Sequence, residues 1–190
     1  MRIFSRTIAG RRRVRHTRGG FSLIELLVCI AIIMVISGVV LARYKSFNST
    51  LLLRNLAYEI ALSTREAQVL GISVKGSTSG SVTSFTTAYG MHFTPGMTYT
   101  LFADTNGNNQ YDDGEAVSAY TIGQNNQIKD DAPRCPLTML DVLFKRPNPD
   151  ALFYTNATAI VASSVCVSVV ASDGNTRTVR IWSTGQIAVE

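Results

Sequence analysis

Residues 20–42 read GFSLIELLVCIAIIMVISGVVLA, an apolar run whose one charged side chain is Glu25. From Phe21 to Ala42 the run contains 22 residues. At about 1.5 Å per residue, a helix of this length measures roughly 33 Å, which is sufficient to cross the hydrocarbon core of a bilayer. The sequence therefore predicts a membrane-spanning helix over residues 21–42.

Glu25 is the unusual residue of this run. A carboxylate is disfavoured by about 2.5–3.5 kcal/mol at the centre of a membrane span, so an acid found there is by default functional and has a partner. The alternative is that Glu25 lies close enough to the end of the span to reach the lipid headgroups. Both interpretations stay open on energetic grounds alone.

The positive charge of the chain is concentrated before the apolar run. Residues 1–20 contain seven arginines and no acid, whereas from Phe21 onward 11 basic side chains face 13 acidic ones. By the positive-inside rule, the basic leader stays in the cytoplasm and the C-terminal part crosses the membrane. The net charge of +5 therefore belongs to the leader, which argues against a nucleic-acid-binding protein.

The leader differs from an ordinary secretory signal. Such a signal has its apolar region before a small-residue cleavage site, whereas here Gly19 and Gly20 precede the apolar run. Cleavage after Gly20 would leave the hydrophobic helix on the mature chain. The stretch RGGFSLIE, residues 18–25, resembles the type III signal of type IV pilins and of type II secretion pseudopilins.

This resemblance implies a processing and assembly route. A prepilin peptidase would cut between Gly20 and Phe21 and methylate the new N-terminal Phe21. Glu25 would pair with the free amine of Phe21 on a neighbouring subunit, and opposite charges attract strongly in a low-dielectric bundle. The implied partners are other pilin or pseudopilin subunits, the peptidase, an inner-membrane assembly platform and membrane lipid.

A second helical pattern follows the apolar run. From Ser49 onward, apolar residues recur at three- and four-residue steps and predict an amphipathic helix that ends near Gly71. The positions expected to face inward are Leu53, Leu56, Ala57, Ile60, Ala61, Thr64, Ala67 and Leu70 or Val69. We expect one helix from about Phe21 to about Leu70; the alternative is two helices with a loop at residues 46–50.

The remainder of the chain has the pattern of short strands. A polar loop is expected over residues 76–87, followed by strands near 85–93, 98–103, 116–122, 137–144, 152–161, 164–171, 177–182 and 186–189. The predicted fold class is α+β, with the long helix packed on an antiparallel sheet. The predicted domains are a cleaved leader (1–20), a membrane and assembly half-helix (21–42), an amphipathic half-helix (43–71) and an extracytoplasmic β-rich head (72–190).

The body of the chain is most similar to the GspH/FimT group of minor subunits. The segments that carry this similarity are residues 65–68, the Asp/Asn-rich stretch 102–115, and residues 181–186. The resemblance implies a structural subunit of a type IV pilus or a type II secretion pseudopilus. It would sit as a single-pass protein in the inner membrane, with its head outside the cytoplasm, before it joins the filament.

Residues 104–115 also have the spacing of a calcium loop. The oxygen ligands would come from six residues: Asp104, Asn106, Asn108, Gln110 through its carbonyl, Asp112 and Glu115. Asn109 stands where such loops have glycine, and strands rather than helices flank the segment. A plain β-turn whose Asx side chains bond their own backbone is the favoured alternative. No other cofactor is expected.

Three cysteines fit the predicted topology. Cys29 lies within the apolar run and is interpreted as a small apolar residue. Cys135 and Cys166 both lie in the predicted head, where an oxidising compartment would permit a disulfide; two buried free thiols are the alternative. His92 is the single histidine after residue 20, and no phosphate loop or nucleophile motif is present, so catalysis is not expected.

A binding role for the head is the second hypothesis. Relatives in the minor-subunit group are linked to DNA uptake through basic C-terminal regions, but residues 185–190 contain no cation. Lys129, Arg134, Lys145 and Arg146 would form a basic patch only if the fold gathers them, and nearby acids such as Asp141 would weaken it. Calcium-dependent adhesion through residues 104–115 is a variant of this hypothesis.

Overall fold

The computed structural model describes residues 20–73, 77–79, 82–84, 87–156 and 158–190. The predicted leader up to residue 19 lies outside the described residues, as do residues 85 and 86 of the first predicted strand. The chain divides into two compact units, Met1–Arg43 and Tyr44–Glu190. Each is described by itself below.

A single helix, α1, contains both predicted helical patterns. It extends over Leu23–Ile72 without a break, so the alternative of two helices with a loop at residues 46–50 is wrong. The predicted end near Gly71 is confirmed to within one residue, but Gly71 itself lies inside the helix. A Cβ on Gly71 would collide with the backbone carbonyl of Phe144, so this glycine allows the helix to approach β7 closely instead of ending it.

The second unit contains two main antiparallel sheets and a short hairpin. The six-stranded sheet has the order β5-β4-β3-β7-β8-β9, and the four-stranded sheet has the order β12-β11-β10-β6. The strands of the first are β3 (Ala88–Phe93), β4 (Thr98–Asp104), β5 (Ala116–Thr121), β7 (Leu140–Phe144), β8 (Ala151–Thr155) and β9 (Thr158–Ala159). Those of the second are β6 (Gln127–Lys129), β10 (Ser164–Val170), β11 (Thr176–Trp182) and β12 (Ile187–Val189).

The predicted α+β class is confirmed, but four details of the strand prediction are wrong. Strand β6 (Gln127–Lys129) was not predicted. The sheet is divided in two rather than single. The stretch expected to be a polar loop contains strands β1 (Ser77–Ser79) and β2 (Val82–Ser84). The predicted strand 152–161 is a hairpin instead, because the chain turns at Asn156, whose φ of 47° lies in the left-handed region.

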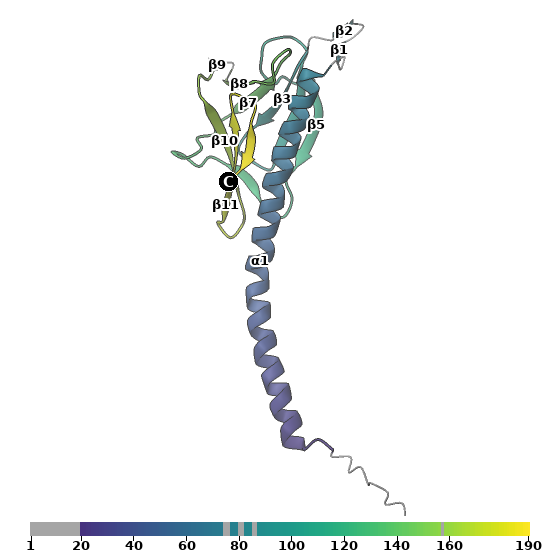
Figure 1. Cartoon of the computed structure of the whole chain (residues 1–190), viewed down its shortest axis with the longest axis vertical. Coiled ribbons are helices and arrows are strands. Elements are labelled where there is room, and N and C mark those ends of the chain that lie inside the picture. The colour runs from purple at the N-terminus through teal and green to yellow at the C-terminus, as the bar shows by residue number, and fades with distance from the viewer. Residues whose placement is uncertain (1–19, 74–76, 80–81, 85–86, 157) are drawn as a thin grey trace, which may run out of the picture. The chain divides into compact units, whose positions relative to one another are not determined.

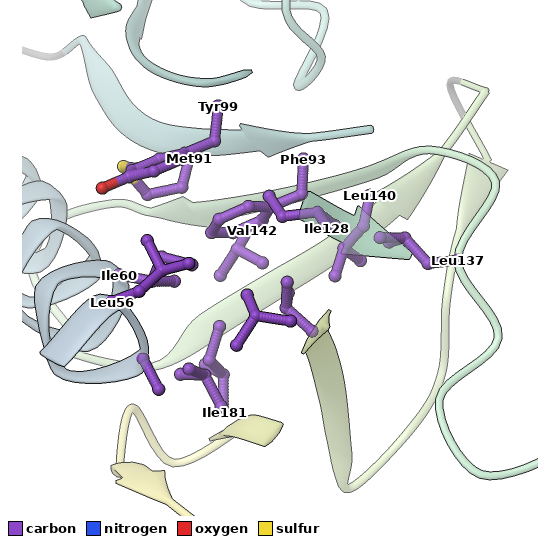
Figure 2. Packing of buried hydrophobic residues seen from close by; sticks show 14 of the residues in the cluster. Leu56, Ile60, Met91, Phe93, Tyr99, Ile128, Leu137, Leu140, Val142 and Ile181 are labelled. Carbon is purple, nitrogen blue, oxygen red and sulfur yellow. The ribbon is translucent and has the colours of Figure 1, made fainter. Parts of the chain in front are cut away.

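The inward face of α1 agrees with the predicted periodicity. Within the second unit, α1 lies beside the strands (Figure 1). Leu53, Ala57 and Ile60 are buried, while Leu70 is half-buried and Val69 is exposed. Figure 2 shows Leu56 and Ile60 pointing into the cluster of strand side chains that includes Val142.

One core joins the helix to both sheets. It includes Met91, Phe93 and Tyr99 from the six-stranded sheet together with Val167 and Ile181 from the four-stranded one. Burial of these apolar side chains, at about 25 cal/mol per Å² removed from water, is the main force that stabilises the second unit. The head and the amphipathic half of the helix therefore form one folding unit.

Candidate functional site

The predicted cleavage site lies directly before the helix. Gly20, Phe21 and Ser22 have no regular secondary structure, and all three are exposed. A peptide bond must be accessible and outside a helix to enter a peptidase, and the Gly20–Phe21 bond meets both conditions. Helical hydrogen bonding begins immediately afterwards, where the amide of Leu26 donates to the carbonyl of Ser22 at 3.1 Å.

Glu25 occupies the first turn of α1. The N-terminal end of a helix carries partial positive charge, which favours a carboxylate at this position. The side chain of Glu25 is exposed and forms no ion pair within the part of the chain that the structure describes. The ion pair that the resemblance implies for Glu25 would therefore involve a group outside these residues.

The first unit presents a continuous apolar surface. The segment Leu23–Leu41 has a mean hydropathy of 2.9 and is 0% buried, so it is long and apolar enough to cross a membrane. Its side chains, from Leu23 at 81% to Leu41 at 70% exposed, make no core of their own. Exposed apolar area on this scale marks a surface that lipid or other proteins cover.

Two carboxylates hold the loop at residues 104–115 by bonding its backbone. Asp104 is buried, and its Oδ1 accepts from the amides of Gly107 (2.8 Å) and Asn108 (3.1 Å). Glu115 is also buried, and its Oε1 accepts from both the amide and the hydroxyl of Thr105, at 2.7 and 2.8 Å. These are charge-assisted hydrogen bonds, which are stronger than neutral ones.

The remaining predicted calcium ligands lie on the outside of the same loop. The side-chain amide of Asn106 donates to Asp112 Oδ2 at 2.8 Å, and the backbone N–H of Gln110 donates to Asn108 Oδ1 at 3.1 Å. These are the hydrogen bonds that the β-turn interpretation predicts. Among the described residues, no group of three or more His, Cys, Asp or Glu is placed to hold a metal ion. Calcium binding therefore stays a prediction.

The structure brings Cys135 and Cys166 together in a disulfide, with an S–S distance of 2.06 Å and a Cα–Cα distance of 5.4 Å. Cys166 lies in β10, and Cys135 lies in the segment that precedes β7. The bond therefore attaches the 130–139 segment to the four-stranded sheet. Cys29 is exposed in the first unit and is the one free cysteine of the described residues.

His92 has a buried partner that the sequence analysis missed. Its Nδ1 lies 2.6 Å from Oδ1 of Asp141, an acid that is only 1% exposed, and its ring lies 4.8 Å from that of Tyr111. The missed signal is an acid inside the buried apolar run LDVLF of β7. Asp141 is therefore not a surface acid that weakens a basic patch, as predicted, because it pairs with His92 across the β3–β7 ladder.

The predicted basic residues do not line one pocket. Arg134 precedes β7 and lines a pocket with Arg177 and Arg180, whereas Lys145 and Arg146 follow the other end of β7. The DNA-binding hypothesis therefore gains no support from this pocket.

Comparison with known proteins concerns the N-terminal segment. Residues 15–41 match the family model described as "Prokaryotic N-terminal methylation motif", a range that includes Gly20, Phe21 and Glu25. No curated protein and no solved structure matches the chain. The N-terminal segment, with an exposed Gly20–Phe21 bond and an exposed apolar helix, is therefore similar to a prepilin-type methylation motif.

Proposed function

We propose that the protein is a minor pilin or pseudopilin that is cut between Gly20 and Phe21 and then assembles through α1 into a type IV pilus or a type II secretion pseudopilus. The observation that carries this proposal is the methylation motif at residues 15–41. It coincides with an apolar helix segment, Leu23–Leu41, that is long enough to cross a membrane. The second unit has its own core, so it does not need the first half of the helix to fold.

On assembly, the apolar segment of α1 would move from one apolar environment to another. Before assembly, lipid would surround the segment Leu23–Leu41, and the seven leader arginines would hold the N-terminus in the cytoplasm. In the filament, neighbouring helices would replace the lipid. The amine that cleavage creates on Phe21 would neutralise Glu25 of an adjacent subunit and set the axial register between helices, as buried charge pairs do in other helical assemblies.

The GspH/FimT group is the subclass that we favour. Two of the segments that resemble this group meet in space, since the side chain of Gln68 donates to the carbonyl of Gly185 at 3.0 Å. The third segment, residues 102–115, is a loop held by its own carboxylates. The contact between Gln68 and Gly185 supports a head fold shared with this group. The peptidase, the assembly platform and other pilin subunits would be the partners of the chain.

The first experiment tests processing. The full chain is co-expressed with a prepilin peptidase in membranes, and the intact mass of the product is measured. We expect loss of residues 1–20 and one added methyl group on Phe21. Gly20→Val should block cleavage, whereas the matched change Gly38→Val, at a helical glycine with open space around it, should not. An uncut wild-type chain would contradict the proposal.

The second experiment tests the role of Glu25. Removing one member of a buried ion pair costs about 3–5 kcal/mol, so Glu25→Val should reduce incorporation into filaments by far more than tenfold. Glu59→Val changes an exposed acid of the same helix and should leave incorporation unchanged. Normal incorporation of the Glu25→Val chain would count against the register role.

A further inference from the structure

A cavity of about 500 Å³ lies in the second unit, and none of the described residues that line it belongs to α1. Its walls come from the segment before β7, from the chain between β8 and β10, and from β10 and β11. The side chains that make it apolar are Leu137, Met139, Leu140, Ile160 and Val165. Ligand pockets of small molecules commonly measure 300–1,000 Å³ and are mostly apolar, so this cavity has the size and lining of a binding site.

The wall before β7 is fixed in place. The disulfide joins Cys135 to Cys166 of β10, and Asp130 Oδ1 accepts a 3.0 Å hydrogen bond from the amide of Leu137. The hydroxyl of Thr155 donates to the carbonyl of Met139 at 2.7 Å. A wall that is held at both ends is preorganised, which lowers the ordering cost of binding.

Cationic groups stand at the mouth of the cavity. A neighbouring pocket of about 320 Å³ shares Arg134 and Arg180 with the cavity and adds Arg177. Arg180 is already occupied, because its Nε and Nη2 donate to the carboxylate of Glu190 at 2.9 and 3.1 Å. Arg134 and Arg177 form no ion pair with any residue that the structure describes. These two guanidinium groups retain hydrogen-bond donors for an anion, although the charge of Arg134 also acts on Glu190 and lowers the pKa of that carboxyl.

The acids near the mouth offset part of this charge, because a carboxylate that accepts hydrogen bonds stays negative. Asp130 and Glu190 are the two acids that line the pockets, and each already accepts hydrogen bonds from within the chain. Among the described residues that line the larger cavity, none is aromatic. Nucleobases usually stack on aromatic rings, so an aliphatic group suits the apolar part of this cavity better than a nucleobase does.

We propose that this cavity binds an aliphatic carboxylate. The hydrocarbon chain would enter the apolar cavity between Leu137 and Val165, and the carboxylate would bond Arg134 and Arg177 at the mouth. Guanidinium groups present paired N–H donors that match the two oxygens of a carboxylate. This proposal concerns the head alone and does not depend on the proposed function.

Methionine methyl NMR gives a local test on the full chain in detergent. The chain has five methionines, of which Met139 lines the cavity, Met97 is exposed elsewhere in the head and Met34 lies on the apolar helix. Hexanoate is the probe, and the Met139 signal is assigned with Met139→Leu. We expect a saturable shift of the Met139 methyl signal and none at Met97, while Met34 reports uptake of the probe into the detergent.

Matched probes and variants distinguish a carboxylate site from a merely apolar one. Hexanol and hexylammonium have the same hydrocarbon chain but no carboxylate, and should bind the wild-type chain at least about tenfold more weakly than hexanoate does. Hexanoate should likewise bind the Arg134→Gln and Arg177→Gln variants at least about tenfold more weakly than it binds the wild-type chain. Lys145→Gln removes an exposed cation elsewhere and should change nothing. An unshifted Met139 signal, equal binding of hexanol, or equal hexanoate affinity in both arginine variants would each overturn the proposal.

Discussion

The side-chain amide of Gln68 joins α1 to two distant backbone segments, since it donates to the carbonyl of Gly185 at 3.0 Å and to that of Pro149 at 2.8 Å. Gln68 is only 4% exposed. Gly185 has a φ of 79°, and a Cβ there would collide with the Pro149 carbonyl. The helix, the turn after β11 and the segment before β8 therefore meet at one side chain.

Loss of this side chain should destabilise the second unit. Gln68→Ala leaves two carbonyls without their donor, and each such hydrogen bond contributes about 0.5–1.5 kcal/mol, so the free energy of unfolding should fall by about 1–3 kcal/mol. Urea unfolding of the full chain in detergent, followed by the fluorescence of the single tryptophan, Trp182, measures this. Gln186→Ala, at an exposed glutamine, is the control. Equal stability of both variants would contradict the role of Gln68.

Tyr99 should make the fold sensitive to alkali. Burial raises the pKa of Tyr99 from 10.0 to about 12. Since the folded state holds this proton more tightly than the unfolded state, the contribution is fully present below pH 10 and is lost as the pH rises from 10 toward 12. The stability of the wild-type chain should therefore decline over this range, as measured by urea unfolding at stepped pH.

Tyr99→Phe should remove that part of the decline. The Tyr99 hydroxyl is buried and makes no hydrogen bond within 3.5 Å to a described residue, although Ser63 lies close enough to lower the pKa of Tyr99 against the effect of burial. Removal of the hydroxyl should therefore leave stability at pH 7 unchanged or raise it by about 1 kcal/mol. Tyr58→Phe, at a half-exposed ring (51%), is the matched control and should retain the alkaline loss. A Tyr99→Phe chain that is clearly less stable at pH 7 would show that the hydroxyl is bonded.

The disulfide should be detectable by mass. Reduction and alkylation of the full chain after export should modify Cys135 and Cys166, whereas alkylation without reduction should modify Cys29 alone. The loop between the two half-cystines spans 31 residues, and the loop-entropy model assigns such a bridge about 3–4 kcal/mol of stability. The reduced chain should therefore unfold at a lower urea concentration than the oxidised chain does. Free Cys135 and Cys166 in the exported protein would exclude the bridge.

Calcium binding at residues 104–115 is tested by isothermal titration of the full chain in detergent. The calcium-loop interpretation expects heat at or below millimolar calcium that Asp112→Asn weakens, because Asp112 would be a ligand. The turn interpretation expects none. Asp104→Ala should destabilise the head under either interpretation, since Asp104 holds three loop amides at 2.8–3.1 Å. The absence of a heat of binding at millimolar calcium would contradict the calcium interpretation.

The sequence by itself determined the features that depend on local pattern. The glycine-aromatic-glutamate spacing and the uninterrupted apolar run predicted the methylation motif and the exposed helix, and the three- and four-residue periodicity identified the buried face from Leu53 to Ala67. These predictions held because a membrane span and an amphipathic helix are each specified by residues close together in the chain.

Only the tertiary structure decided which distant residues meet. The division into two sheets, the pairing of His92 with Asp141, the contacts of Gln68 and the cavity with Arg134 at its mouth all join residues far apart in sequence. The sequence of one strand does not show which other strand it pairs with, because the alternation of side chains with period 2 is the same in any sheet. Pairing and burial depend on how the whole core closes, so a polar residue such as Asp141 or Gln68 is recognised as buried only once its partner is in place.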